Sequence, residues 1–273
     1  MNQLDYFTLF SSALDLDGKD VLEIGGAIPP SKVLSLKVKS WTSIDINERR
    51  LEDAEHSNSQ DTRYKTLLMS AENMGFEDQK FDVIFSGNCF EHIFDVPSAL
   101  AEMYRVLRND GILFTKFSPI WSGPIGHHTW VWDEDNVVAF WQPGGVFPDW
   151  YHLSHSEEEL SEFLEEKYNP KLKADILKYV YRSNDINRWI DTQYINEISN
   201  YNYNPIINHT IKSRHHPSNQ VLETIRHKYP EVTDFRTLGF YWILSKSKPT
   251  FKQYLRAFLG SFFSLIKIKL SSH

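Results

Sequence analysis

Residues that could have a chemical role lie at the ends of two apolar runs. Val21–Ile24 leads directly into Gly25 and Gly26, and Asp45 ends a second apolar run 22 residues after Glu23. Glycines at the end of a strand let the backbone turn tightly beside a ligand, and an acid ending the next strand can accept hydrogen bonds from both ribose hydroxyls. The spacing predicts a site for an adenosine-containing cofactor, although two glycines after a strand also form ordinary turns.

Four further segments follow in order between residues 20 and 118. They are Met69–Glu72 after a third apolar stretch, Phe81–Ser86 as a fourth strand before Gly87–Ile93, a helical pattern over Pro97–Leu107, and Arg105–Gly111 before the strand Ile112–Phe117. The turn Glu91–Ile93 reads EHI, and Arg105–Gly111 reads RVLRNDG. Together the ordered segments resemble the class I S-adenosylmethionine-dependent methyltransferases, in which the corresponding motifs are EHI and RVLKPGG.

The resemblance implies an α/β fold with a doubly wound, mostly parallel seven-stranded sheet and a largely helical insertion after strand five. Alternating strands and helices agree with this fold class, in which ligands lie above the carboxyl ends of the strands. The implied cofactor is S-adenosylmethionine. Carried over to this sequence, the cofactor-binding residues are Glu23, Gly25, Gly26, Asp45, Ile46, Ala71, Glu72, Ser86 and Asn88.

The glycine loop departs from the family's pattern. The usual Asp/Glu-x-Gly-x-Gly-x-Gly run would place glycines at positions 25, 27 and 29, whereas this chain has Gly25, Ala27 and Pro29, with an extra Gly26. Ala27 adds a methyl group where the methionine moiety usually passes, and Pro29–Pro30 removes two backbone donors. We therefore expect a different loop path and weaker or altered cofactor binding.

A second departure concerns the adenine contact. The family often has Asp where Ser70 stands, and its carboxylate binds the adenine amino group, so Ser70 or Glu72 must serve here. These departures motivate an alternative function, a methyltransferase-like scaffold protein without turnover. A nicotinamide-dependent oxidoreductase is disfavoured because the Gly-x-Gly-x-x-Gly pattern is absent.

Composition limits the remaining function classes. The 273 residues are 41% hydrophobic and 24% charged, which is typical of one globular domain with an elaboration. A net charge of −7 disfavours a nucleic-acid partner. The single cysteine, Cys89, cannot form an internal disulfide, and the acidic N-terminal region does not resemble a secretory signal. We expect a cytoplasmic protein, with peripheral contact at the inner membrane surface as an addition.

Residues 119–230 are predicted to form an aromatic and helical insertion within a methyltransferase domain of residues 1–250. Because the insertion leaves the fifth strand, it begins beside the methyl donor and would form a substrate lid. The alternative is a satellite core under a long loop, and both can hold together. Its first part carries five of the eight tryptophans, namely Trp121, Trp130, Trp132, Trp141 and Trp150.

Later segments are less regular. Ser154 or Ser156 before three glutamates predicts a helix start, and the helix is expected to reach about residue 168. Residues 201–219 are expected to be polar and irregular, and Thr237–Leu244 reads as the antiparallel last strand. The sixth strand cannot be placed from the sequence. No metal site is expected, because the histidines in this region lack ligand-type spacing with Cys or paired acids.

Residues 251–273 predict a basic amphipathic helix with phenylalanines at helical spacing. Its uncharged stretch, 257–266, is shorter than the roughly 20 residues that span a bilayer. Such a helix docks on its own domain or forms a homodimer, or it lies on an anionic membrane surface. We expect docking, with peripheral membrane contact as the alternative. Its charged residues are Lys252, Arg256, Lys267 and Lys269.

Methyl transfer is an in-line displacement, so the enzyme must aim the acceptor at the methyl carbon. A hydroxyl acceptor also needs a base, and histidine suits this role at neutral pH. The candidates are His128 and His127 after strand five and His92 after strand four, with Glu91 beside it. Only one of the adjacent pair would face the acceptor, and we favour His128. We expect O-methylation of a small molecule or a sugar, on which tryptophans could stack, in surface-polysaccharide or natural-product synthesis.

Overall fold

The computed structural model describes residues 3–26, 28–55 and 61–271 of the chain. These residues form two compact units, each assembled from separate stretches of sequence. The first unit contains residues 1–117, 197–209 and 240–273, and the second contains residues 118–196 and 210–239. The second unit is therefore not one continuous insertion of residues 119–230, because the chain returns to the first unit in between.

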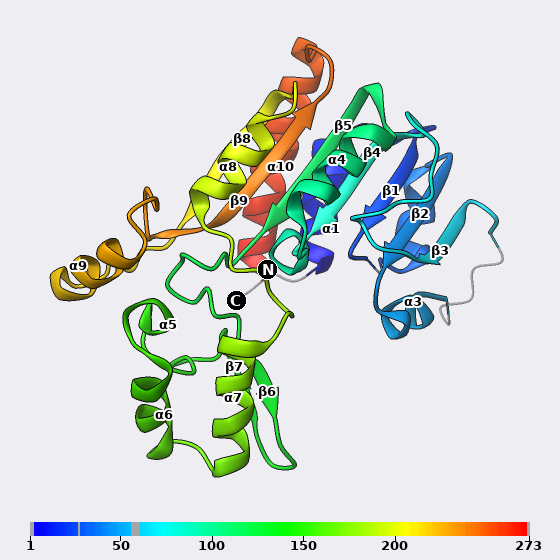
Figure 1. Cartoon of the computed structure of the whole chain (residues 1–273). Coiled ribbons are helices and arrows are strands. Elements are labelled where there is room, and N and C mark those ends of the chain that lie inside the picture. Colours follow the sequence, from blue (N-terminus) through cyan, green and yellow to red (C-terminus); the bar gives the residue numbers. More distant parts are fainter. Residues whose placement is uncertain (1–2, 27, 56–60, 272–273) are drawn as a thin grey trace. The chain divides into compact units, whose positions relative to one another are not determined.

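Seven strands form one mostly parallel sheet in the order β3-β2-β1-β4-β5-β9-β8 (Figure 1). Each of the first five pairs in parallel with its neighbour, and β9 runs antiparallel to β5. The order reverses between β1 and β4, the kind of point where a doubly wound sheet binds its ligand. The predicted fold class is confirmed. The bounds are β1 (Asp20–Ile24), β2 (Ser40–Asp45), β3 (Tyr64–Leu68), β4 (Phe81–Gly87), β5 (Leu107–Phe117), β8 (Asn204–Lys212) and β9 (Thr237–Ser245).

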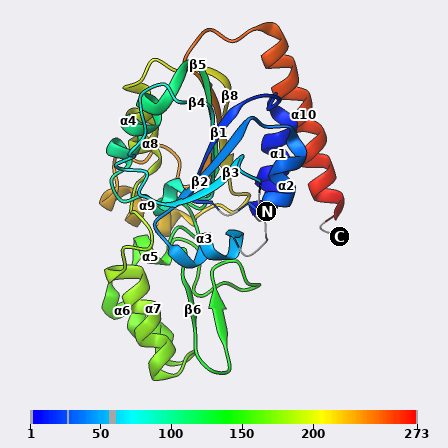
Figure 2. The ribbon, with the colours of Figure 1, turned by 90° about the vertical axis from the view of Figure 1, so that its right-hand side faces the viewer.

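Helices cover both faces of this sheet in the first unit. Helices α1 (Gln3–Ala13) and α10 (Phe251–Ser271) lie on one face and α4 (Val96–Val106) on the other (Figures 1 and 2). Phe10 of α1 packs against Phe85 of β4 with ring centroids 4.6 Å apart, and its ring meets Trp41 of β2 edge-on. The first helix therefore belongs to the core. Shorter helices are α2 (Pro30–Val33), η1 (Leu34–Leu36), α3 (Glu48–Glu55) and η2 (Phe90–His92).

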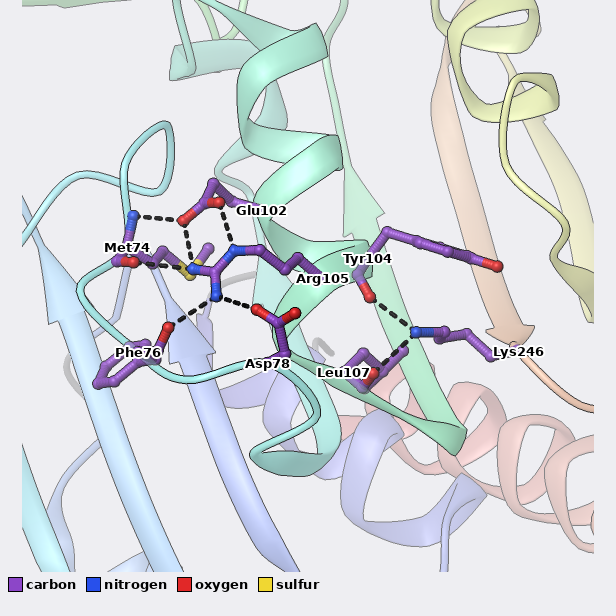
Figure 3. Close-up of polar contacts among 8 residues, drawn as sticks. All are labelled: Met74, Phe76, Asp78, Glu102, Tyr104, Arg105, Leu107 and Lys246. Atoms are coloured by element: carbon purple, nitrogen blue, oxygen red, sulfur yellow. Dashed lines mark hydrogen bonds and ion pairs between the residues drawn. The ribbon is translucent and has the colours of Figure 1, made fainter.

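Arg105, the first residue of the RVLRNDG motif, fastens α4 to the segment that follows β3 (Figure 3). Its guanidinium donates to the carbonyls of Met74 at 2.9 Å and Phe76 at 2.7 Å, and it pairs with Glu102 and Asp78 at 2.7 Å each. A planar guanidinium with five donors suits such a multiple contact. The motif thus fixes the loop that leads from β3 to β4.

Lys246, just after β9, contacts the same C-terminal end of this helix (Figure 3). Its ammonium donates to the carbonyls of Tyr104 and Leu107, each at 2.9 Å. These carbonyls lie at the end of α4, where a cation satisfies orphan acceptors and complements the helix dipole. The last antiparallel strand is in this way tied to the helix that precedes β5.

The second unit has its own hydrophobic core. Trp121 and Trp150 are buried in it, and the Trp150 indole donates to the carbonyl of Phe235 at 2.8 Å. Helix α6 begins at a complete capping box formed by Ser156 and Glu159, as the sequence predicted, but it ends at Glu165 rather than near residue 168. The bounds are β6 (Trp130–Trp132), β7 (Val137–Ala139), α5 (Tyr151–Ser154), α6 (Glu157–Glu165), α7 (Pro170–Arg182) and α9 (Asn219–Lys228).

The expectation of an irregular segment over residues 201–219 is wrong. Strand β8 occupies Asn204–Lys212 and is the sixth strand along the chain of this sheet, while α8 (Asp191–Ser199) precedes it. Its polar composition hides the strand because it lies at the edge of the sheet, and its side chains are half-buried or exposed. Edge strands often carry proline and charged residues that prevent pairing with another chain, and β8 contains Pro205 and Lys212.

Candidate active site

The loop after β1 requires both of its glycines. Gly25 has a φ of +73°, and a Cβ at this position would lie 2.4 Å from the sulfur of Cys89. A Cβ on Gly26 would lie 2.1 to 2.2 Å from atoms of the Glu23 carboxyl group. The extra glycine, Gly26, is therefore needed because it leaves room for the side chain of Glu23. Ala27 lies outside the described residues.

Glu23 is turned into the protein and holds this loop. Its carboxylate is fully buried and accepts the indole N–H of Trp41 at 2.8 Å, the backbone N–H of Ile28 at 3.1 Å and the hydroxyl of Ser43. A buried carboxylate is stable only when several donors satisfy it. Glu23 thus shapes the cofactor loop through contacts within the protein.

The two prolines that follow fit the loop without a lost hydrogen bond. Pro29 is the residue before α2, and Pro30 occupies the first turn of that helix. The first N–H groups of a helix have no partner inside the helix, so proline costs little at this position. The Pro29 carbonyl accepts the N–H of Lys32 at 2.9 Å. The substitution of glycine by proline at position 29 therefore starts a helix rather than disrupting the loop.

Asp45 ends β2 next to the β1 loop, as its spacing predicted. Its Oδ1 accepts the N–H of Asn47 at 2.7 Å, while its Oδ2 is buried and has no hydrogen-bond partner among the described residues. The guanidinium of Arg50 lies 3.7 Å from Oδ2. A buried oxygen that accepts no hydrogen bond lowers the stability of the fold, and a ribose hydroxyl could supply the missing donor. The next residue, Ile46, is 74% exposed and offers an apolar surface beside this acid.

The segment after β3 connects to the turn after β4. Glu72 accepts the N–H groups of Phe94 at 3.1 Å and Asp95 at 2.9 Å through Oε1, and Ser70 accepts the N–H of Glu72 at 3.1 Å. Ala71 lies buried between these two residues. One oxygen of Glu72 is thus committed to the protein, which leaves the other carboxylate oxygen as the better candidate for an adenine amino group.

The turn after β4 brings Ser86 and Asn88 to the same edge of the sheet. Ser86 is fully buried at the end of β4, and Asn88 has a φ of +49° while its N–H donates to the carbonyl of Lys116 at 2.9 Å. Its side-chain Oδ1 is buried without a hydrogen-bond partner among the described residues. Burial raises the pKa of the neighbouring Cys89 thiol to about 12, so Cys89 packs against Gly25 and stays protonated.

Lys116 is a residue that the sequence reasoning did not single out. It lies near the carboxyl end of β5 and is only 7% exposed, with its ammonium 4.5 Å from the ring centre of Tyr6. Burial lowers the pKa of Lys116 to about 8, while the carboxylates of Glu91 and Asp5 act in the opposite direction. The sequence did contain a signal, namely a lysine within the apolar run that forms the second half of β5. Lysine is almost never fully buried unless it has a partner.

The three histidines occupy different surroundings. His92 lies half-buried in η2 and donates its N–H to the carbonyl of Cys89 at 2.8 Å. In the second unit, His128 is half-buried, has a φ of +53° and lies with its ring centre 4.2 Å from that of Phe140. Both remain candidates for the base.

His127 belongs to the interior of the second unit. It is 2% exposed, its Nδ1 lies 2.7 Å from the hydroxyl of Thr129, and its ring centre is 4.1 Å from that of Phe147. Burial and the neighbouring His152 and His128 hold the pKa of His127 well below its usual value. A ring enclosed in this way cannot reach an acceptor, so the predicted role of His127 as a base is not supported and a packing role replaces it.

Candidate residues for an adenosine-type site therefore lie at three strand ends of the first unit. The glycine loop follows β1, the acid Asp45 ends β2, and Asn88 follows β4. Asp45 and Asn88 each have a buried side-chain oxygen without a hydrogen-bond donor among the described residues. Backbone that turns sharply beside a ligand, an acid for ribose and polar groups at the switch point are the elements of such a site. The residues present fit S-adenosylmethionine.

Comparison with known proteins supports this interpretation. A family model described as a methyltransferase domain matches residues 22–115. YrhH, a Bacillus subtilis protein named as a methyltransferase, is 31% identical over 104 residues, which make up 36% of this chain and 58% of that protein. The chain thus spans a little more than half the length of this curated relative.

Solved structures share the fold over most of the chain. An S-adenosylmethionine-dependent methyltransferase from Mesorhizobium loti superposes with a TM-score of 0.54 at 10% identity and covers 88% of this chain and 97% of its own. A Listeria monocytogenes protein described in the same terms gives 0.53 at 14% identity, with 89% and 98% covered. Residues 22–115 thus match a methyltransferase domain, and the chain shares its fold with these S-adenosylmethionine-dependent methyltransferases.

Proposed function

We propose that this protein is an S-adenosylmethionine-dependent O-methyltransferase that acts on a small-molecule or sugar acceptor, in surface-polysaccharide or natural-product synthesis. The observation that carries methyl transfer is the set of strand-end residues in a family-typical order, with Asp45 presenting a buried oxygen for ribose. S-adenosylmethionine supplies an electrophilic methyl group when it is bound. The protein's own residues then have to hold the cofactor, aim the acceptor and remove a proton.

The cofactor would be held by main-chain turns and by a few fixed acceptors. Gly25 and Gly26 let the β1 loop approach the ligand, and Glu23 keeps that loop in shape from behind. Asp45 would accept the ribose hydroxyls, and the exposed side chain of Ile46 would cover one face of the adenine. Such preformed contacts reduce the entropy lost on binding.

A carbohydrate acceptor is supported by a group of exposed tryptophans in the second unit. Trp130 lies with its ring centre 5.8 Å from that of Trp132 and 5.5 Å from that of Trp141, and at least half of each side chain is exposed. Exposed aromatic faces stack on the apolar faces of sugar rings or on aromatic molecules. Trp121 and Trp150 are instead core residues. One group of tryptophans therefore forms a satellite core, and the exposed group is available for an acceptor.

Proton removal is assigned to His128, with His92 as the second candidate. Both residues are half-buried, whereas His127 is enclosed. A neutral imidazole can take the proton of a hydroxyl as the methyl group is transferred. His128→Ala should leave cofactor affinity unchanged and lower kcat.

The test is a methyl-transfer assay with purified protein, S-adenosylmethionine and a panel of nucleotide-linked sugars, free sugars and phenols. We expect formation of S-adenosylhomocysteine and a methylated product with at least one polar acceptor. For that acceptor, Trp132→Ala should raise KM about 10-fold with little change in kcat, because a stacking surface is lost. Val137→Ala is the matched control, since Val137 is exposed and pairs with Trp132 across the β6–β7 hairpin.

Two results would change the proposal. If the cofactor binds and no acceptor of the panel is methylated, the scaffold function, which the departures at Ala27, Pro29 and Ser70 first suggested, becomes the better explanation. If only phenols are methylated, the acceptor class moves from sugars to aromatic molecules, and the same tryptophans would serve it.

A further inference from the structure

Helix α10 turns its large apolar side chains outward. Those side chains recur at intervals of three and four residues, so that they form one stripe along the helix. Each is between 41% and 80% exposed, and we call them the α10 stripe. Its members are Phe251, Leu255, Phe258, Leu259, Phe262, Phe263 and Ile266. A contiguous exposed apolar surface of this kind marks a site of interaction.

The opposite side of α10 consists of small residues and packs on α1. Ala257, Ser261 and Ser264 are buried there, and a Cβ on Gly260 would lie 2.1 Å from the carbonyl oxygen of Ser12 in α1. The two helix backbones therefore approach closely at Gly260. The helix docks on its own domain as expected, but it docks through its small face and not through its phenylalanines.

Further contacts prevent the helix from rotating the stripe inward. The hydroxyl of Tyr241 in β9 lies 2.7 Å from that of Ser261, and Tyr254 donates to the carbonyl of Pro205 at 3.4 Å. A rotation would bring phenylalanine rings against the backbone of α1, where there is no room even for a Cβ at position 260. The outward direction of the stripe is thus a property of the folded unit.

Charge distinguishes the partners that could cover this stripe. The helix contains no acidic residue, and Lys252, Arg256 and Lys267 are exposed along one side of the stripe. Arg256 is 3.6 Å from Asp15 and remains largely at the surface. These cations belong to a chain whose net charge is −7, so they are a local exception to its overall charge. In a dimer formed stripe to stripe, the cations of α10 would face the cations of the second helix, whereas an anionic lipid surface attracts them.

We propose that the α10 stripe is a membrane-surface site that lies in the interface of a bilayer rich in anionic lipid. Phenylalanine and leucine side chains would enter the boundary of the acyl chains, while the lysines and Arg256 reach the headgroups with their long stems. No helix in the described part of the chain is long and apolar enough to cross a bilayer. The proposal concerns where the protein works and is independent of the reaction it catalyses.

The test is co-sedimentation of the full-length protein with vesicles of phosphatidylcholine alone and of phosphatidylcholine mixed with phosphatidylglycerol. We expect binding to the anionic vesicles that weakens as salt is added. The double variant Phe258→Ser/Phe262→Ser should bind roughly 100-fold more weakly, because two aromatic rings that would be buried in the bilayer are lost. The variant Lys252→Gln/Arg256→Gln should lose about 10-fold on anionic vesicles only.

Phe94→Ser is the matched control, since Phe94 and Phe258 are each 65% exposed. It should bind the vesicles as the natural protein does, and thermal unfolding checks that all variants are folded. Equal binding by Phe258→Ser/Phe262→Ser, or no binding to anionic vesicles, would overturn the proposal. Sedimentation equilibrium without lipid adds one more decisive result: a dimer that this double variant dissociates would assign the stripe to a second copy of the chain.

Discussion

The two units of this protein use similar residues in different ways. In the first unit, the residues proposed to bind the cofactor lie where parallel strands end, and the order of strands brings Gly25, Asp45 and Asn88 to one edge of the sheet. In the second unit, the same residue type serves opposite purposes, since Trp150 is buried in the core and Trp132 is exposed. Strand ends therefore locate function from sequence, whereas residue type alone does not.

The largest expected effect is on stability, when a buried and an exposed tryptophan of the second unit are each replaced by alanine. Trp150→Ala removes a buried ring and leaves the carbonyl of Phe235 without its donor, so we expect a loss of about 3 to 5 kcal/mol in the free energy of unfolding. Trp132→Ala should change stability by less than about 0.5 kcal/mol, because the side chain lies at the surface. Chemical denaturation measures both. Similar losses for the two variants would contradict the division into core and surface tryptophans.

A smaller effect is expected at the glycine loop. Gly26→Ala would drive a methyl group into the Glu23 carboxyl group, and neither can move without breaking the bond to Trp41. We expect a cost of about 2 to 3 kcal/mol in stability and a clear loss of cofactor affinity. Gly75→Ala is the control, because a Cβ there would meet only Met69, at an ordinary 3.7 Å. A Gly26→Ala protein of unchanged stability and affinity would show that the loop is not fitted to Glu23.

The smallest effect concerns pH and the buried Lys116. Its pKa falls from 10.5 in the unfolded chain to about 8 in the fold. Between these values the unfolded state binds the proton and the folded state does not, so this lysine makes stability rise with pH. Between pH 8 and pH 10, the natural protein should therefore gain about 1 to 3 kcal/mol relative to Lys116→Met. Lys252→Met, which removes a lysine at the protein surface, is the control. A stability difference between the natural protein and Lys116→Met that does not change with pH would contradict the prediction.

The fold could be predicted to a large extent because its signals are local. Glycines after Ile24, the acid at Asp45 and the RVLRNDG motif each lie within a few residues of the element that they define, and their order fixes the sheet. Strand β8 was missed because polar residues interrupt its isoleucines and no side chain in it is fully buried. A single sequence gives the pattern of burial only where two faces of an element differ in polarity.

Site details depend on distant contacts that spacing does not reveal. The glycine at position 26 looked like a departure from the motif, yet it accommodates the carboxyl group of Glu23, which in turn bonds Trp41 on the next strand. His127 and His128 are neighbours in sequence, but only the packing of the second unit shows that one is enclosed. The direction of the α10 stripe likewise follows from Gly260 and its fit against α1.

The proposed function depends on binding of S-adenosylmethionine at the strand ends of the first unit, with Asp45 as the ribose acceptor. Calorimetric titration of the natural protein and of Asp45→Ala with S-adenosylmethionine and S-adenosylhomocysteine tests it most directly. We predict micromolar binding of both ligands to the natural protein and a loss of about 1 to 3 kcal/mol in binding free energy for Asp45→Ala. Absence of binding to the natural protein, or equal affinity in Asp45→Ala, would contradict the claim.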